Sequence, residues 1–212
     1  AYDGTVSDVS DVVVGTAFTI TGTDLVYGVD YTYPASTGVL TIRSDKDITI
    51  KNTNSSTSTT DRIEVADGVS ANITLAGVNI DVSSQSDTAA FKIADNSAGN
   101  VTITLADGTT NTLKSGDNCA GLQKNGEYSE TLGKLTITGT GTLTATGGEY
   151  GAGIGGGFEA NGSNITISGG VVIANGGGGS NGGAGIGGGG SGGGSYGSGS
   201  NITINGGTVT AT

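Results

Sequence analysis

The chain has 212 residues with a formal charge of −11, no histidine, one cysteine and 43 glycines, about three times the ordinary share of glycine. This composition excludes an internal disulfide, a cysteine–histidine zinc site and a serine–histidine–aspartate triad. The charge argues against nucleic acid or an anionic membrane as partner, and the mean hydropathy near zero argues against a membrane span. The Thr, Val and Ile content favours strands over helices.

Residues 1–46 contain alternating stretches such as TAFTITG but lack the repeat that follows them. We expect these residues to form an N-terminal β cap, with Tyr27, Tyr31 and Tyr33 covering apolar edges that would otherwise invite strand pairing. The chain opens at Ala1 without the basic and apolar regions of a signal peptide, so it is either not secreted or a mature secreted protein. We expect the second, with an extracellular or cell-wall-associated location.

Residues 47–212 carry a repeat of apolar-Thr-apolar triplets. The triplets begin at Ile48, Ile73, Val101, Leu135, Ile165 and Ile202, with spacings of 25, 28, 34, 30 and 37 residues. A period of this length is typical of a solenoid. Four triplets follow an asparagine (Asn72, Asn100, Asn164, Asn201), a residue that tolerates the left-handed backbone of a sharp corner.

Two further alternating stretches complete each repeat. A second stretch follows the triplet, as in Val78–Val82, Thr142–Ala145, Val171–Ala174 and Thr208–Ala211, and a third precedes the next triplet, as in Arg62–Val65 and Ala90–Ile93. The segments IEVADGVSANITL and FKIADNSAGNVTI align without a gap, which pairs Ile63 with Phe91 and Ile73 with Val101. We therefore predict an all-β, right-handed parallel β-helix of about five to six coils with three short strands in each coil.

The third strands predict a candidate binding surface. Their outward positions form a column from polar to bare: Glu64, Lys92, Gln123, Gly155 and Gly187. Four aromatic residues lie in or beside the adjoining turns: Tyr128, Tyr150, Phe158 and Tyr196. Sugar rings stack on aromatic faces while amides and carboxylates bond sugar hydroxyls, so we expect carbohydrate binding at Glu64, Lys92, Gln123 and these four aromatic residues. The alternative is that the aromatic side chains only cover loop backbone.

The run GAGIGGG occurs at 151–157 and again at 183–189, and its first copy matches the dinucleotide pattern G-x-G-x-x-G. That pattern needs a helix directly after the glycines, whereas FEANGSNITI predicts a turn into a strand. We interpret the glycines as positions where backbones approach closely.

No cofactor is expected, although the sequence leaves calcium binding open. Asp67, Asp95, Asp107 and Asp117 offer hard oxygens at turns, but Asp-Gly and Asp-Asn are ordinary turn dipeptides and no EF-hand spacing is present.

The quoted repeats, together with NTLKSGDNCAGLQ, LTITGTGTLTATGG and NITINGGTVTAT, resemble the Thr/Gly-rich β-helical repeats of large cell-surface proteins in Gram-positive anaerobes. More distantly, the chain is similar to small bacterial carbohydrate-binding β-helix domains, and the resemblance covers roughly residues 38–212. The resemblance implies an extracellular right-handed parallel β-helix with an adhesive or polysaccharide-binding role, in some members with calcium. The expected partner is a polysaccharide or a host or cell-surface glycan, and the expected function is non-enzymatic.

Three alternatives stay open at this point. End-to-end self-association would make the chain a subunit of a surface filament. A polysaccharide lyase-like enzyme would need clustered carboxylates with a basic residue, for which Glu64, Lys92 and Lys124 are the candidates. An outward threonine file (Thr49, Thr74, Thr102, Thr136, Thr166, Thr203) would suit ordered water at an ice surface, although β-propensity alone also produces such a file.

Overall fold

The computed structural model describes residues 15–126 and 131–212, in which all regular secondary structure is β-strand. These residues form 19 strands in three mostly parallel sheets, which confirms the predicted all-β class. Along the described chain there is no helix that could cross a membrane.

The first sheet contains the predicted triplets, and its seven strands lie in the order β1-β4-β6-β9-β12-β15-β18. Their bounds are β1 Phe18–Thr21, β4 Asp47–Asn52, β6 Ala71–Leu75, β9 Val101–Leu105, β12 Leu135–Gly139, β15 Gly162–Ile167 and β18 Gly199–Ile204. All neighbours are parallel except β1, which is antiparallel to β4.

The second sheet has five parallel strands in the order β19-β16-β13-β10-β7. Their bounds are β7 Asn79–Asp81, β10 Thr110–Lys114, β13 Thr142–Thr146, β16 Val171–Asn175 and β19 Thr208–Ala211.

The third sheet has seven strands in the order β17-β14-β11-β8-β5-β3-β2, and only β2 is antiparallel to its neighbour. Their bounds are β2 Tyr31–Thr32, β3 Val39–Ile42, β5 Arg62–Val65, β8 Phe91–Ile93, β11 Leu122–Lys124, β14 Ile154–Gly155 and β17 Ile186–Gly187.

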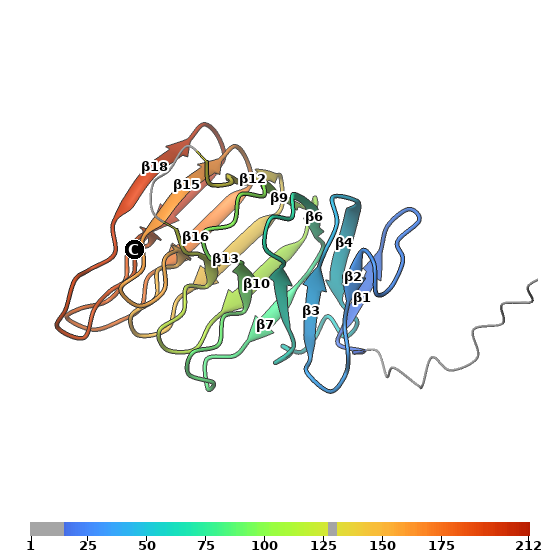
Figure 1. The fold of residues 1–212 in the computed structure, drawn as a ribbon, viewed down its shortest axis with the longest axis horizontal. Coiled ribbons are helices and arrows are strands. Elements are labelled where there is room, and N and C mark those ends of the chain that lie inside the picture. Colours follow the sequence, from blue (N-terminus) through green and yellow to red (C-terminus); the bar gives the residue numbers. More distant parts are fainter. Residues whose placement is uncertain (1–14, 127–130) are drawn as a thin grey trace, which may run out of the picture.

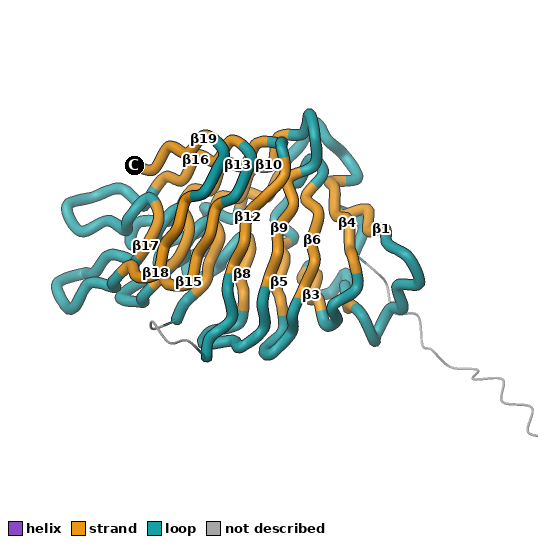
Figure 2. The backbone as a smooth tube through the Cα atoms, turned by 90° about the horizontal axis from the view of Figure 1, so that it is seen from above, coloured by secondary structure: helices purple, strands orange, loops and turns teal. Residues whose placement is uncertain are grey.

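From β5 onward the chain visits the third, first and second sheets in turn, and each repeat adds one strand to each sheet. Figures 1 and 2 show the repeats following one another along the long axis, from β1 and β4 towards β18. The inward positions of the three sheets supply one core, in which Ile63, Ile103 and Leu143 are fully buried. Burial of alternate residues explains why apolar-Thr-apolar triplets form these strands.

The pairing register corrects one sequence-based expectation. Ile63 pairs with Phe91 as predicted, but Ile73 pairs with Ile103 instead of Val101. The connection from β8 to β9 is two residues longer than the one from β5 to β6, and the gapless alignment concealed this difference. A shift of two residues keeps every side chain on its face, so the core is unchanged.

The same shift divides the predicted threonine file into two columns. One contains Asn72, Thr102, Thr136, Thr166 and Thr203, and the other contains Thr49, Thr74, Thr104 and Thr138. The single file from Thr49 through Thr74 to Thr102 is therefore wrong in its pairing.

The asparagine corners are confirmed in part. Asn164 and Asn201 have φ values of 56° and 49°, in the left-handed region, whereas Asn72 and Asn100 are absent from the described residues with positive φ. The side chains of Asn72 and Asn100 act as hydrogen-bonding groups instead: Asn72 Nδ2 donates to Asp45 O at 3.1 Å, and Asn100 Oδ1 accepts from the Lys134 backbone N–H at 2.9 Å.

The N-terminal region contributes β1 and β2 at the edges of the first and third sheets. Tyr33 is fully buried, whereas Tyr27 and Tyr31 pack partly buried against the core with their rings 5.6 Å apart. Residues 1–14 of the predicted cap lie outside the described residues. The parallel pairing of β3 with β5 begins before residue 47, and the domain boundary at residue 46 stays a prediction.

Candidate carbohydrate-binding site

The residues predicted to form the outward column of the third sheet are paired with one another on neighbouring strands. Thr41, Glu64, Lys92 and Gln123 are paired in succession, and Gly155 and Gly187 continue the column. Because neighbouring strands lie about 4.8 Å apart, these positions form one row across the sheet. Along this row, charged side chains are followed within a few repeats by glycines, which have no side chain.

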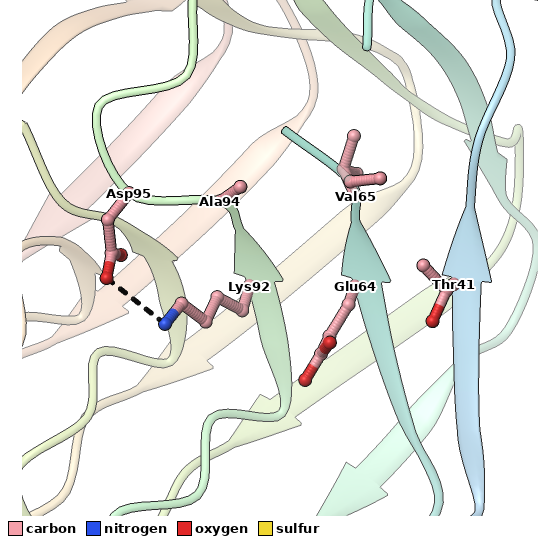
Figure 3. A pocket seen from close by; sticks show the side chains of 7 residues that line it. Thr41, Glu64, Val65, Lys92, Ala94 and Asp95 are labelled. Carbon is pink, nitrogen blue, oxygen red and sulfur yellow. Dashed lines mark hydrogen bonds and ion pairs between the residues drawn. The ribbon is translucent and has the colours of Figure 1, made fainter. Parts of the chain in front are cut away.

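A cleft of about 250 Å³ lies at the charged end of this column. Its walls are formed by Thr41, Glu64, Val65, Ala66, Lys92, Ala94 and Asp95. Figure 3 shows the Thr41, Glu64 and Lys92 side chains leaving three adjacent strands on the same side, with Lys92 reaching towards Asp95. The cleft therefore presents a hydroxyl, two carboxylates and an ammonium group within a short stretch of surface.

The charged side chains of the cleft form two ion pairs. Lys92 Nζ lies 3.2 Å from Asp95 Oδ2, and Arg62 Nε lies 3.2 Å from Glu64 Oε1. The Lys92 and Glu64 side chains are 36% and 34% exposed, so both can reach a ligand. Exposed pairs of this kind contribute only about 0–1 kcal/mol to stability, so a ligand can compete for them at little cost.

Gln123 occupies the next position of the column but is only 5% exposed. Its Oε1 accepts a hydrogen bond from the Ala120 backbone N–H at 3.2 Å. This side chain is committed to its own loop and presents little surface to a ligand.

Lys124, one of the candidate basic residues of the lyase alternative, pairs with the core residue Ile93 and is 4% exposed. Its position on the inward face removes it from the cleft, and burial lowers the pKa of its amine.

Two of the predicted aromatic residues form a pair. The rings of Tyr150 and Phe158 are 5.4 Å apart at an angle of 76°, and Phe158 is 41% exposed. The negative charge of Glu149 raises the pKa of Tyr150. This pair belongs to the repeat of β14, two repeats beyond β8, and therefore forms a contact separate from the cleft.

Tyr196 lies apart from both groups. It is 56% exposed, and its hydroxyl donates to Asn181 Oδ1 at 2.7 Å. It borders a cavity of about 340 Å³ whose walls are mostly glycine, including Gly187. Tyr128, the remaining predicted residue, lies outside the described residues.

The glycine run is explained by close backbone contacts. A Cβ on Gly151 would lie 1.8 Å from the carbonyl oxygen of Cys119, and one on Gly183 would lie 2.4 Å from Gly151. The strand β15, and not a helix, follows the first copy of the run. The structure thus confirms close backbone approach and lacks the helix that a dinucleotide site requires at this place.

The aspartates considered for calcium lie at separate turns. Gly68 and Gly108, which follow Asp67 and Asp107, have φ values of 70° and 65°, as ordinary turns require. Among residues 15–126 and 131–212, no three histidine, cysteine, aspartate or glutamate side chains gather in one place. These aspartates therefore do not fit a multi-carboxylate calcium site, and calcium binding stays an untested expectation.

Sequence reasoning missed Thr41 as a member of the column and considered Asp95 only for calcium. The segment VLTI around Thr41 has the same alternation as RIEV, and this signal could have identified it. Reasoning from the triplets also omitted β10, whose TNTLK begins with polar residues.

Comparison with known proteins identifies a matching family model. The family described as carbohydrate-binding domain-containing protein matches residues 62–167, which are half of the chain. The matched segment runs from the first residue of β5 to the last residue of β15 and includes Glu64, Lys92 and Asp95. No curated protein and no solved structure matches the chain.

Proposed function

The chain belongs to the family of carbohydrate-binding domain-containing proteins, and from this premise we propose that its cleft at Glu64, Lys92 and Asp95 contacts the glycan. The observation that carries the proposal is the convergence of these side chains in one cleft within the matched segment. Sugar hydroxyls donate and accept hydrogen bonds, and the cleft offers both an ammonium donor and carboxylate acceptors.

The proposed role is non-enzymatic. Glycoside hydrolysis uses two carboxylates that face one sugar bond, one as acid and one as base or nucleophile. Here Glu64 and Asp95 are each engaged by a cation of their own, Arg62 and Lys92. This arrangement supports hydrogen bonding to a ligand more than proton transfer.

The Tyr150–Phe158 pair supports a second contact along the same glycan. Phe158 presents a partly exposed ring that meets Tyr150 in a T-shaped contact, and sugar rings pack against such apolar surfaces. Phe158→Ala should weaken polysaccharide retention while leaving the strand signal in circular dichroism unchanged.

Substitution in the cleft tests the proposal. In affinity gels with neutral or acidic polysaccharides, Glu64→Gln and Lys92→Gln should each reduce retention by about fivefold, because each removes a charged hydrogen-bonding group. Lys114→Gln is the matched control, since Lys114 forms a comparably exposed ion pair with Asp81 on the second sheet. Mobility is compared with a gel lacking polysaccharide, which corrects for the change in charge. Equal retention of all three variants and the unmodified protein would remove the cleft from the proposal.

We further propose that the three sheets form a right-handed parallel β-helix and that the protein acts as an adhesive module outside the cell. The successive visits to the three sheets support the β-helix, and the resemblance of the repeats to those of cell-surface proteins supports the location. Location can be tested by protease shaving of intact cells, which should remove the protein without lysis.

A filament subunit is the second candidate function. The outer edges of β17, β18 and β19 have no strand partner among the described residues, and Ile204 on β18 is 54% exposed. Such an edge can pair with another copy. Electron microscopy of concentrated protein should then show filaments, and monodisperse particles would count against this candidate.

A further inference from the structure

A cavity of about 360 Å³ lies on the outer side of the first sheet, on different strands from the cleft. It is lined by Asn100, Leu132, Lys134, Asn164, Thr166, Asn201 and Thr203. Its volume lies within the range of about 300–1,000 Å³ that small-ligand sites occupy.

Thr166 is the unusual member of this lining. It lies between Thr136 and Thr203 in the register of the first sheet, yet it is only 4% exposed. Its hydroxyl has no hydrogen-bond partner among the residues that the structure describes, although it borders the cavity. The hydroxyl oxygen is therefore open to the cavity, where a bound molecule can supply a hydrogen bond.

The amides around Thr166 are held by the protein. Asn164 Nδ2 donates to Leu132 O at 3.1 Å, and Asn201 Nδ2 donates to Asn164 Oδ1 at 2.6 Å. Asn100 Oδ1 accepts from the Lys134 backbone N–H at 2.9 Å. These bonds fix the side chains before a ligand arrives, which reduces the entropic cost of binding.

Asn100 and Asn201 still offer free groups to the cavity. Within the described part of the chain, Asn100 Nδ2 and Asn201 Oδ1 have no partner, and Lys134 forms no ion pair. The cavity therefore combines amide and ammonium donors, an amide acceptor and a hydroxyl, with Leu132 as an apolar wall. No carboxylate lines it, in contrast to the cleft on the third sheet.

We propose that this cavity binds one sugar residue through its ring hydroxyls, as a further glycan contact separate from both the cleft and the Tyr150–Phe158 pair. The inference rests on the proposed carbohydrate-binding function and adds a site to it. Vicinal hydroxyls match alternating donors and acceptors, and the C–H face of a sugar ring matches Leu132. Two sites on one chain raise the avidity for a polymer above that for a single sugar.

The direct test uses isotope-labelled protein and four monosaccharides: D-glucose, D-galactose, N-acetylglucosamine and D-galacturonate. At least one should produce saturable shifts in the NMR signals of the Thr203 methyl group and the Asn201 side-chain amide. Thr166→Val removes the hydroxyl while keeping the shape, and it should raise the Kd by about fivefold. Thr136→Val is the matched control, because Thr136 pairs with Thr166 but does not line the cavity. Shifts with galacturonate alone that Lys134→Gln abolishes would assign the ligand to acidic sugars, and shifts with the neutral sugars would assign it to their hydroxyls.

Saturable binding that Thr166→Val does not weaken would overturn the proposal, as would the absence of shifts with all four sugars. The polysaccharide gels separate the two claims. Retention that depends on Glu64 and Lys92 but not on Thr166 would overturn this site alone. Retention and sugar shifts that depend on Thr166 but not on Glu64 or Lys92 would support this site and overturn the cleft. No retention and no shifts would overturn both.

Discussion

Replacing Gly151 with alanine tests whether the glycine run permits close backbone approach. The added Cβ would lie 1.8 Å from the Cys119 carbonyl oxygen and 2.2 Å from the Cys119 carbonyl carbon, whereas ordinary contacts are 3.4–4 Å. Because these are backbone atoms, no side chain can rotate away. One of the two backbones must move.

The expected cost follows from two terms. Overpacking of a well-filled site costs about 1–3 kcal/mol. Movement of Gly151 also strains the hydrogen bond from the Gly177 N–H to the Gly151 carbonyl, which is 2.8 Å long, and loss of one such bond costs about 0.5–1.5 kcal/mol. Gly151→Ala should therefore lower the free energy of unfolding by about 2–4 kcal/mol.

Urea unfolding followed by circular dichroism measures this loss, with Gly178→Ala as the control. Gly178 is exposed and has no atom within 4 Å of an added Cβ. An alanine there should be neutral or stabilise the protein by up to about 1 kcal/mol through the unfolded chain. Equal unfolding midpoints for the two variants would refute the close-packing interpretation of GAGIGGG.

Three further predictions concern buried side chains. Phe91→Ala should lower the free energy of unfolding by about 3–5 kcal/mol in the same urea assay, because the ring is fully buried; a loss below about 1 kcal/mol would contradict this. Because burial lowers the pKa of Lys124, the unfolded chain binds its proton more tightly, and the free energy of unfolding should rise with pH up to the ordinary pKa of 10.5. Lys124→Met should have a higher free energy of unfolding than the unmodified protein near neutral pH, and this free energy should no longer rise with pH. If the urea midpoints of both proteins change equally with pH, the buried amine of Lys124 is not the cause. Burial raises the pKa of Cys119 to about 11, so iodoacetamide at about pH 8 should alkylate the folded protein at least tenfold more slowly than the urea-unfolded protein, and equal rates would show that the thiol is accessible.

The sequence was sufficient to predict most strands because burial alternates with period two in many strands of all three sheets, such as β4, β5, β9 and β10. It predicted the pairing of Ile63 with Phe91 correctly and that of Ile73 with Val101 incorrectly. Alternation cannot distinguish registers that differ by two residues, since both leave the same side chains inside. The longer connection before Val101 becomes visible only when the strands are paired in space.

Site residues could be predicted from the sequence where strand alternation and pairing with neighbouring strands determine their position. Glu64 and Lys92 follow from alternation alone and lie in one cleft. The burial of Gln123 could not be predicted in this way, because its Oε1 contacts depend on the conformation of the loop at Ala120. Thr166 resembles Thr136 in the sequence, yet Thr166 is buried whereas Thr136 is half-buried, a difference that alternation within one strand does not predict.

In the first sheet, pairing registers that differ by two residues bury the same side chains, and this ambiguity also affects how the chain folds. A strand such as β9, VTITL, could dock two residues out of register with its hydrophobic face still covered, at little energetic cost. Misaligned docking would then be a kinetic trap that must be undone before the next repeat can add. The strands of the third sheet are short, and Phe91 fills a position that smaller side chains occupy elsewhere, as at Ile63 and Leu122. We expect the third sheet to select the register during folding, so that Phe91→Leu would slow refolding by more than its effect on stability alone would produce.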